Sequence, residues 1–299
     1  MHIRISLPQQ TLELHDERGT LLRRYLVSTA SNGAGEQNGS FRTPRGRHIV
    51  RAKVGAGEAA NTVFVRRRPT GELWTPQLAE QFPERDWILT RILWLSGKEP
   101  GRNRLGEVDT MRRYIYLHGS PDTVAMGSPA SIGCVRMRNG DIVELFDRIP
   151  PYTPVDIVEF GVDAGAWNEL GEAARQVRET VFVDEQNVPR DMEWDEHDAV
   201  SRHVIARDSD GGVIGTGRLL ADGQLGRMAV LADWRGKGVG RALLERLLEE
   251  ATRLGLEHPA LHAQTQASGF YRRFGFVEEG PEFMEAGIPH RIMVRSACP

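Results

Sequence analysis

Two segments of the 299-residue chain combine residue types that could perform covalent chemistry. The first places His118 at the end of the apolar run Tyr114–His118, followed by Cys134 within Ser131-Ile-Gly-Cys-Val-Arg-Met137. A thiolate is a strong nucleophile, and an imidazole within hydrogen-bond reach can accept the thiol proton and later protonate a leaving amine. A tight Gly-Cys turn can also direct backbone N–H groups at a developing oxyanion. The alternative is that Cys134 is a small buried hydrophobic residue.

The second segment is a glycine-rich turn between a predicted strand and a predicted helix. The strand Leu225–Val230 leads into Arg235-Gly-Lys-Gly-Val-Gly240, and an amphipathic helix follows over Arg241–Leu254. Backbone N–H groups at the positive end of a helix suit a pyrophosphate. The alternative is an ordinary tight turn without a ligand.

The elements that position these segments change in character along the chain. Short strands separated by Gly, Pro and Asn predict a mainly β first half, with a helical insertion expected within Leu73–Gly97. This insertion carries three of the six tryptophans, which either wall a cleft or form a satellite core. The expected strands are Ile3–Leu7, Leu12–Leu14, Leu21–Ser28, His48–Lys53, Tyr114–His118 and Val155–Phe160.

From Trp167 onward, helices and strands alternate, which predicts an α/β domain. We therefore expect two domains, residues 1–160 and 161–299, with the boundary near Gly161–Gly165. The strand Val155–Phe160 could end the first or open the second. The remaining expected elements are a helix over Glu169–Phe182, strands over Ser201–Arg207, Gly212–Leu220, Gln224–Val230 and Leu261–Gln264, and a helix over Gly238–Leu254.

Composition limits the classes of function. The net charge of −3 divides into about +4 before residue 160 and about −7 after it, without a basic stripe that would indicate nucleic acid binding. The two cysteines, Cys134 and Cys298, are too few for a disulfide framework, so we expect free thiols. No apolar run is long enough to span a bilayer, and the N-terminus has no signal-peptide pattern. We expect a cytoplasmic protein with no membrane partner and no metal.

The first half resembles the YkuD-type L,D-transpeptidases over residues 1–160. The resemblance rests on His118-Gly119, on the Ser131–Met137 segment, on Thr43-Pro-Arg-Gly46 and on Asn139-Gly-Asp141. It implies that Cys134 is the nucleophile, His118 the base and the Gly119 carbonyl the group that orients the imidazole. Ile132 stands where many members have a histidine.

The same resemblance implies further roles around the nucleophile. Gly133 and Cys134 would supply oxyanion N–H groups, and Ser131 would contact the substrate. Arg136 would pair with a substrate carboxylate through its planar fork. The family attacks the bond between diaminopimelate and D-Ala in peptidoglycan stem peptides, and an amine or water resolves the acyl-enzyme.

The second half resembles the ElaA-like branch of the GNAT acetyltransferases over residues 166–296. The resemblance rests on the glycine-rich turn, on Val181–Pro189, on Ala267–Phe276 and on Gly287-Ile-Pro-His290. It implies acetyl-CoA as cofactor and Tyr271 as the acid that protonates the leaving thiolate, while Phe270, Phe274 and Phe276 are expected in the core. The implied cofactor-binding residues are Met228, Ala229, Val230, Arg235, Gly236, Lys237, Gly238, Val239, Gly240 and Arg241.

Together these resemblances predict a mainly β YkuD-like fold followed by an α/β GNAT fold with a central mixed sheet. The expected enzyme is an L,D-carboxypeptidase or transpeptidase acting on recycled muropeptides, joined to an N-acetyltransferase whose small-molecule or peptide amine acceptor is open. Glu185, His203 and His290 are candidate acceptor-side bases, each with a structural role as the alternative. Two other functions stay open: an exported transpeptidase that forms 3-3 cross-links, and a GNAT half that binds acetyl-CoA without turnover.

Overall fold

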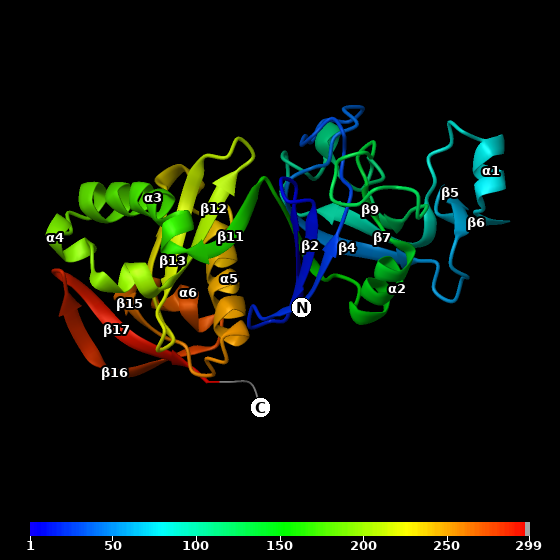
Figure 1. The fold of residues 1–299 in the computed structure, drawn as a ribbon. Helices are drawn as coiled ribbons and strands as arrows, with labels where there is room; N and C mark the ends of the chain where they lie inside the picture. Colours follow the sequence, from blue (N-terminus) through cyan, green and yellow to red (C-terminus); the bar gives the residue numbers. More distant parts are fainter. Residues whose placement is uncertain (297–299) are drawn as a thin grey trace. The chain divides into compact units, whose positions relative to one another are not determined.

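The structure is a computed structural model that describes residues 1–296, and the chain divides into two compact units (Figure 1). The first unit comprises Met1–His15 and Leu22–Glu159. The second comprises the chain from Phe160 onward together with the turn Asp16–Leu21. We expected that turn in the first domain, because nothing in its composition distinguishes it from its neighbours. Cys298 lies outside the described residues.

The first unit is built on one mixed sheet. Its strand order is β3-β2-β1-β10-β4-β7-β5-β6, while β8 pairs with β7 and β9 pairs with β8. The strands are β1 (His2–Ser6), β2 (Thr11–His15), β3 (Leu21–Leu26), β4 (Gly46–Val54), β5 (Thr62–Val65), β6 (Arg68–Leu73), β7 (Leu89–Gly97), β8 (Tyr116–Gly119), β9 (Val135–Met137) and β10 (Pro154–Val158). Two α-helices accompany them, α1 (Pro76–Gln81) and α2 (Asn139–Arg148), together with a short 3-10 turn at Gly106–Val108.

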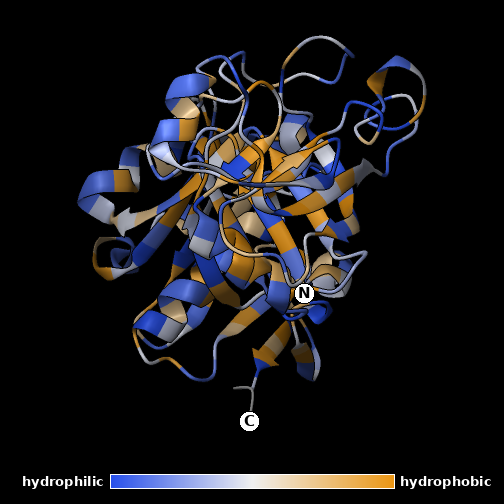
Figure 2. Cartoon of the chain, turned by 90° about the vertical axis from the view of Figure 1, so that its right-hand side faces the viewer, coloured by the Kyte–Doolittle hydropathy of each residue, from blue (hydrophilic) through white to orange (hydrophobic). Residues whose placement is uncertain are grey.

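The core of this unit lies between the sheet and α2. Ile142, Leu145 and Phe146 recur at helical spacing on one face of α2 and are buried with β1, β2, β7, β8 and β10. Figure 2 shows hydrophobic residues concentrated in the central strands and hydrophilic ones in the connecting loops. The two short strands β8, which carries His118, and β9, which follows Cys134, contribute Leu117, Val135 and Met137 to this core and are fixed by it.

The expected helical insertion over Leu73–Gly97 is wrong for most of its length. Only Pro76–Gln81 is helical, and Leu89–Gly97 is the strand β7, which pairs with β4 on one side and with β8 on the other. These pairings are non-local, so they override a local pattern that does not alternate strictly. Trp74 and Trp87 pack in a satellite cluster with Val63 and Leu89, as one of the two interpretations predicts.

The second unit is an α/β structure around a seven-stranded mixed sheet with the order β11-β12-β13-β14-β15-β17-β16. Its strands are β11 (Phe160–Ala166), β12 (Arg202–Asp208), β13 (Val213–Leu219), β14 (Gln224–Val230), β15 (Ala260–Gln264), β16 (Phe276–Glu285) and β17 (Ile288–Arg295). Its α-helices are α3 (Trp167–Arg178), α4 (Arg190–Glu193), α5 (Val239–Arg253) and α6 (Ser268–Arg272), with 3-10 turns at Glu196–Val200, Ala232–Trp234 and Thr265–Ala267.

Two irregularities shape this unit. The parallel pair β14 and β15 is joined only at Gln224 and Leu225, so the strands separate beyond that point although both continue. After α3 the chain widens into a π-helical turn over Glu179–Glu185 instead of continuing as the predicted α-helix to Phe182. π-helical turns are rare in proteins, and those that occur often lie at functional sites. Together with the separation of the strands, this turn makes the region between β14 and β15 a candidate site.

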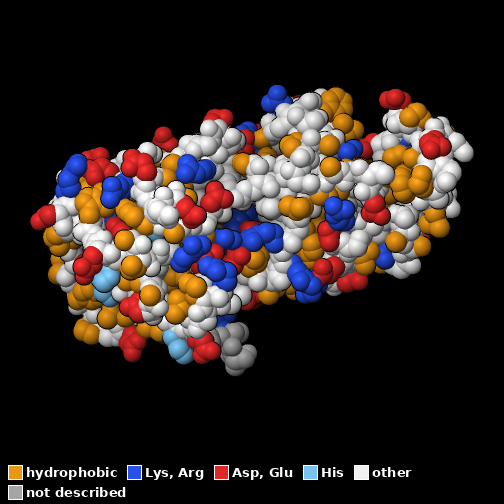
Figure 3. All heavy atoms as spheres, viewed as in Figure 1, with side chains coloured by type: hydrophobic (Ala, Val, Ile, Leu, Met, Phe, Trp, Pro, Cys, Tyr) orange, Lys and Arg blue, Asp and Glu red, His pale blue; other side chains and the backbone are white. Residues whose placement is uncertain are grey.

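The surface shows interspersed charges. On the face drawn in Figure 3, Lys and Arg side chains lie among Asp and Glu side chains and apolar residues. Among residues 1–296, no helix is both long and apolar enough to cross a bilayer.

Candidate functional site

The Cys134 site is assembled by two short parallel strands. In the register of β8 and β9, His118 lies beside Arg136 and Leu117 beside Val135, so Tyr116 lies next to Cys134. Side chains in register on neighbouring strands share a face, and residues two apart on one strand share it as well. Tyr116, His118, Cys134 and Arg136 therefore occupy one face of the sheet.

The hydrogen bonds of His118 define its tautomer. Nδ1 lies 2.8 Å from the Gly119 carbonyl oxygen, and because a carbonyl only accepts, Nδ1 must carry the proton. Nε2 is then the nitrogen with a free lone pair, and within the described part of the chain it has no hydrogen-bond partner. Burial lowers the pKa of the imidazole, so His118 is a neutral base at neutral pH.

The thiol is also neutral at rest. Burial raises the pKa of the Cys134 thiol to about 12, and this effect exceeds the opposing effect of the Tyr116 N–H, whose nitrogen lies 3.4 Å from Sγ. Cys134 is half-buried against Phe64, Ile92 and Tyr116, and its Sγ is 3.4 Å from the Tyr114 carbonyl oxygen. Both groups are therefore neutral at rest, and within the described residues no hydrogen bond joins the Cys134 thiol to Nε2 of His118, so the site is not a preformed ion pair.

The loop before Cys134 is held by buried hydroxyl groups. Ser131 is 1 % exposed, and its hydroxyl donates to the Cys134 carbonyl at 2.5 Å and accepts from the Gly133 N–H at 3.2 Å. Thr43 donates to the Gly133 carbonyl at 3.0 Å, and Gly133 has a φ of +133°, which favours glycine.

These contacts bear on two expectations. The buried Ser131 hydroxyl is already used within the loop, which it positions. The Gly133 N–H is already engaged, which leaves the Cys134 N–H as the candidate oxyanion donor.

Arg136 is likewise engaged. Its guanidinium lies 2.7 Å from Asp86 and 3.1 Å from the Ala130 carbonyl, so a substrate carboxylate would have to compete with Asp86 for it. The negative charge of Asp86 raises the pKa of both His118 and Cys134, opposing burial at the first and reinforcing it at the second. No pattern in the sequence singles out Asp86, which lies within the segment expected to be helical.

Above Cys134 lies a pocket of about 740 Å³, a volume typical of ligand sites. Its lining residues come from the loop at Asn38–Phe41, the β5–β6 hairpin, the segment before β7, the start of β8 with the segment before it, and the loop before β9. They are Asn38, Gly39, Phe41, Arg66, Arg67, Asp86, Ile88, Arg113, Tyr114, Ile115, Tyr116, Ile132 and Cys134.

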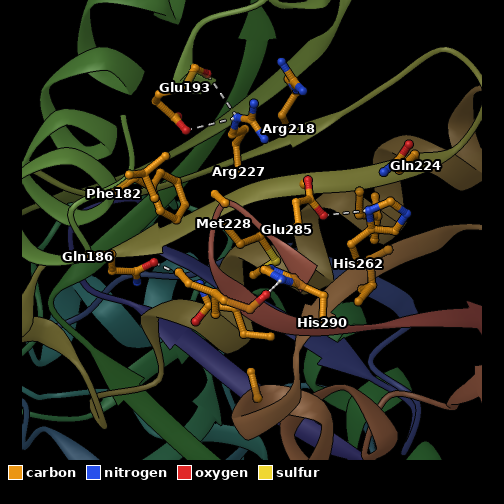
Figure 4. A pocket seen from close by; sticks show the side chains of 18 of the residues that line it. Phe182, Gln186, Glu193, Arg218, Gln224, Arg227, Met228, His262, Glu285 and His290 are labelled. Carbon is orange, nitrogen blue, oxygen red and sulfur yellow. Dashed lines mark hydrogen bonds and ion pairs between the residues drawn. The ribbon is translucent and has the colours of Figure 1, made fainter. Parts of the chain in front are cut away.

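The second site lies where β14 and β15 separate. The backbone beyond Leu225 is not paired with β15, and the pocket there is bordered by Met228 (Figure 4). Tyr271 also lines this pocket. The Tyr271 hydroxyl lies 3.8 Å from Met228 Sδ, and burial raises the pKa of the phenol to about 12. Tyr271 thus remains protonated throughout neutral pH and can act as a proton donor.

The glycine-rich turn fits a phosphate ligand. Gly236 and Gly238 have φ values of +73° and +90°, and a Cβ added to either would meet no heavy atom within 4 Å. Gly238 precedes the first turn of α5, and no side chain caps that turn. The open space and the unpaired first-turn N–H groups give the environment that a pyrophosphate requires.

The other predicted cofactor residues surround this turn. Val230 ends β14, Ala229 is buried against α3, and Arg241 pairs with Glu245. Arg235 forms an ion pair with Glu185 and donates to the Val230 carbonyl at 2.9 Å. Phe274 and Phe276 are core residues, as expected, whereas Phe270 is only partly buried and lies close to Gly240.

The three candidate bases separate clearly. Glu185 is paired with Arg235 away from the pocket. His203 is buried, packs at a tilt against Trp167 and has Nε2 2.9 Å from the Asp198 carbonyl, as the structural alternative predicts. His290 alone of the three lines the pocket, where its Nδ1 lies 2.8 Å from the Ile288 carbonyl (Figure 4).

A buried ion-pair network, which the sequence did not indicate, forms one wall of this pocket. Arg178 pairs with Glu193 at 2.5 Å and with Asp198 at 2.7 Å, and all three side chains are at most 5 % exposed. Arg218 and Arg227 extend the network to Asp195. Breaking one partner of such a network leaves an uncompensated buried charge, so the wall is rigid.

The geometry defines a mainly β domain with a thiol and a neutral imidazole on one face of a sheet, followed by an α/β domain in which a glycine-rich, uncapped helix start lies after the first of two separating strands. A family model of the L,D-transpeptidase catalytic domain (YkuD) matches residues 1–157, and one of the acetyltransferase (GNAT) domain matches residues 167–297. The chain belongs to the YkuD family in its first half and to the GNAT family in its second.

Similar proteins match the second half. The uncharacterized N-acetyltransferase YjcF of Bacillus subtilis is 42 % identical over 40 % of this chain and 87 % of its own length. Protein ElaA of Escherichia coli is 35 % identical over 41 % of this chain and 85 % of its own length. The crystal structure of an acyl-CoA N-acyltransferase from Pseudomonas aeruginosa is 33 % identical, covers 46 % of this chain and 99 % of that protein, and gives a TM-score of 0.43.

The state of His118 predicts a pH profile. Because a base must be unprotonated and burial lowers the pKa of His118, we expect acylation of Cys134 to stay level through neutral pH and to fall only below about pH 6.5. His118→Gln should slow acylation by roughly 10²-fold or more and remove this acid limb. Stopped-flow measurements of acyl-enzyme formation between pH 4 and pH 8 would check both, with His290→Gln as control. An unchanged profile in His118→Gln would remove His118 from the mechanism.

Proposed function

We propose that the first unit is a cysteine L,D-carboxypeptidase that removes D-Ala from diaminopimelate in soluble muropeptides. The observation that carries the proposal is the free Nε2 lone pair of His118, on the same sheet face as Cys134 and its pocket. In acylation, His118 takes the thiol proton while Sγ attacks the diaminopimelate carbonyl carbon. The C–N bond then breaks, His118 returns the proton to the leaving D-Ala amine, and water hydrolyses the thioester.

The second unit is proposed to transfer an acetyl group from acetyl-CoA to an amine. Gly236, Gly238 and the first-turn N–H groups of α5 would hold the pyrophosphate, and the unpaired edge of β14 would hold the rest of the cofactor. The cofactor supplies an activated thioester. Tyr271 donates a proton to the leaving thiolate, and His290 lies in the pocket where an acceptor amine could lose one. Because acetyl-CoA is found in the cytoplasm, its use as a cofactor favours a cytoplasmic location for the protein.

One experiment tests both halves. The protein is incubated with a panel of muropeptides with and without acetyl-CoA, and the products are identified by mass spectrometry. The proposal requires loss of one D-Ala residue from diaminopimelate tetrapeptides without acetyl-CoA, and a gain of one acetyl group on an amine with it. Formation of cross-linked dimers in place of hydrolysis would identify a transpeptidase instead. An intact tetrapeptide in every reaction would contradict the carboxypeptidase.

Tyr271→Phe separates cofactor binding from turnover. Because the change removes only a hydroxyl group, acetyl-CoA should bind as before while thiol release slows by about 10²-fold. Isothermal titration and a thiol-release assay measure the two effects. Tyr152→Phe is the control, because it removes an exposed hydroxyl group of the first unit, and it should turn over like the wild type. Wild-type turnover by Tyr271→Phe would assign the proton to another group.

A further inference from the structure

The β5–β6 hairpin ends in a turn that is unusual for its residues. Arg66 and Arg67 form the two-residue loop between Val65 and Arg68, and both have positive φ values, +49° and +66°. Two-residue loops with positive φ at both positions strongly prefer Asn and Gly, because a side chain strains this conformation. Strained residues of this kind persist mainly at sites of function.

Arg67 is fixed beside the nucleophile. Its guanidinium packs on the rings of Trp94 and Tyr114, at 4.4 and 4.9 Å from their centroids, and donates to the Tyr116 hydroxyl at 3.1 Å. The backbone N–H of Tyr116 in turn faces Cys134 Sγ. The cation–π contacts therefore hold the tip of the hairpin against the pocket that contains the thiol.

Arg66 is the free cation of that pocket. It is exposed, and within residues 1–296 it makes no hydrogen bond, ion pair or ring contact. The other charged lining groups are occupied. Arg113 donates to the carbonyls of Gly35, Glu36 and Arg42, and Asp86 is paired with Arg136.

We propose that Arg66 binds a free carboxylate of the acyl donor, with Arg67 anchoring the hairpin that presents it. The planar guanidinium of arginine can donate two parallel hydrogen bonds to a carboxylate. Arg136, the residue first expected to bind a substrate carboxylate, is instead paired with Asp86. This inference rests on the proposed carboxypeptidase activity. It adds that Arg66 makes that activity specific for an acyl donor with a free carboxylate. The carboxylate belongs either to the terminal D-Ala or to the side chain of diaminopimelate, since both flank the scissile amide.

The test uses Arg66→Asn, because asparagine tolerates positive φ and so removes the charge without adding strain. Arg68→Asn is the matched control, since Arg68 follows in the same hairpin and does not line the pocket. Steady-state kinetics are measured with the tetrapeptide, with its D-alaninamide form and with its diaminopimelate carboxamide form. We expect Arg66→Asn to raise the KM for the tetrapeptide about tenfold at nearly unchanged kcat, with Arg68→Asn like the wild type.

The amidated peptides identify the carboxylate. The analogue lacking the bound carboxylate should react poorly with the wild type, and Arg66→Asn should cause no further loss with it. If Arg66→Asn lowered kcat/KM about tenfold for each of the two amidated peptides, Arg66 would bind neither carboxylate, and the proposal would be overturned.

A second measurement does not depend on the natural substrate. Cys134 is alkylated with anionic iodoacetate or with neutral iodoacetamide, and peptide mass spectrometry follows that one cysteine. Removing a nearby positive charge should lower the iodoacetate-to-iodoacetamide rate ratio by roughly threefold to tenfold in Arg66→Asn but not in Arg68→Asn. If no muropeptide reacts with the wild type but the rate ratio still falls in Arg66→Asn, the proposed carboxypeptidase activity is wrong and the anion-binding role of Arg66 is kept. An unchanged ratio together with an unchanged KM would disprove the subsite.

Discussion

Replacing Cys134 by alanine is expected to reduce the release of D-Ala from a diaminopimelate tetrapeptide below detection, because the acyl-enzyme cannot form without the sulfur. The substitution removes one atom from a half-buried position against Phe64, Ile92 and Tyr116, so the fold should be kept. Binding of acetyl-CoA by the second unit should therefore be unchanged. Liquid chromatography with mass detection measures the D-Ala, and intact-protein mass spectrometry the acyl adduct.

Two variants serve as controls: one replaces the second cysteine, and the other replaces the Cys134 thiol by a hydroxyl group. Cys298→Ala is expected to be silent, although Cys298 lies outside the described residues. Cys134→Ser keeps an attacking group of lower nucleophilicity, so it should retain only a trace of acylation. Full D-Ala release by Cys134→Ala would exclude the thiol mechanism.

Gly238→Val is expected to abolish measurable binding of acetyl-CoA. A valine at a φ of +90° is strained, and its side chain would enter the open space in front of the first turn of α5. Isothermal titration against acetyl-CoA measures the loss.

Gly211→Val is the matched control for the strain. Gly211 has a φ of +84°, also faces open space and lies in the turn between β12 and β13, far along the chain from the glycine-rich turn. It should carry a similar backbone cost and still bind acetyl-CoA. Normal binding by Gly238→Val, or equal loss in both variants, would contradict the phosphate cradle.

The sequence predicted those parts of the structure that local patterns encode. Strand β14 has the predicted bounds, and α5 lies within one residue of them, because a glycine-rich turn separates a short apolar run from a helical period. The motif predicted His118 near the end of a strand and Cys134 in a glycine-containing loop, and the structure has His118 in β8 and Cys134 directly before β9. The strand Val155–Phe160 was undecided because both sheets use it: β10 ends at Val158 and β11 begins at Phe160.

What the sequence missed depends on contacts between distant segments. Strand β7 was expected to be helical. Because it pairs with β4 on one side and β8 on the other, its apolar and polar residues do not alternate strictly, so the usual sequence pattern of a strand is missing. The β5–β6 hairpin has arginines where a turn of its kind usually shows Asn or Gly, so the usual signal was missing. Asp86 lies about fifty residues from Arg136 in the sequence, and only the fold brings them together.

The π-helical turn after α3 makes the shape of the acetyltransferase pocket depend on chain length. Phe182 lies within that turn and Gln186 directly after it, and both line the pocket. Because a π-helix closes i→i+5 bonds where an α-helix closes i→i+4 bonds, loss of one residue there would let the turn rewind as an α-helix and change the directions of the side chains within it. Phe182 would then face elsewhere without being mutated. We therefore expect a relative with one residue fewer in this turn to present a different wall in the corresponding pocket.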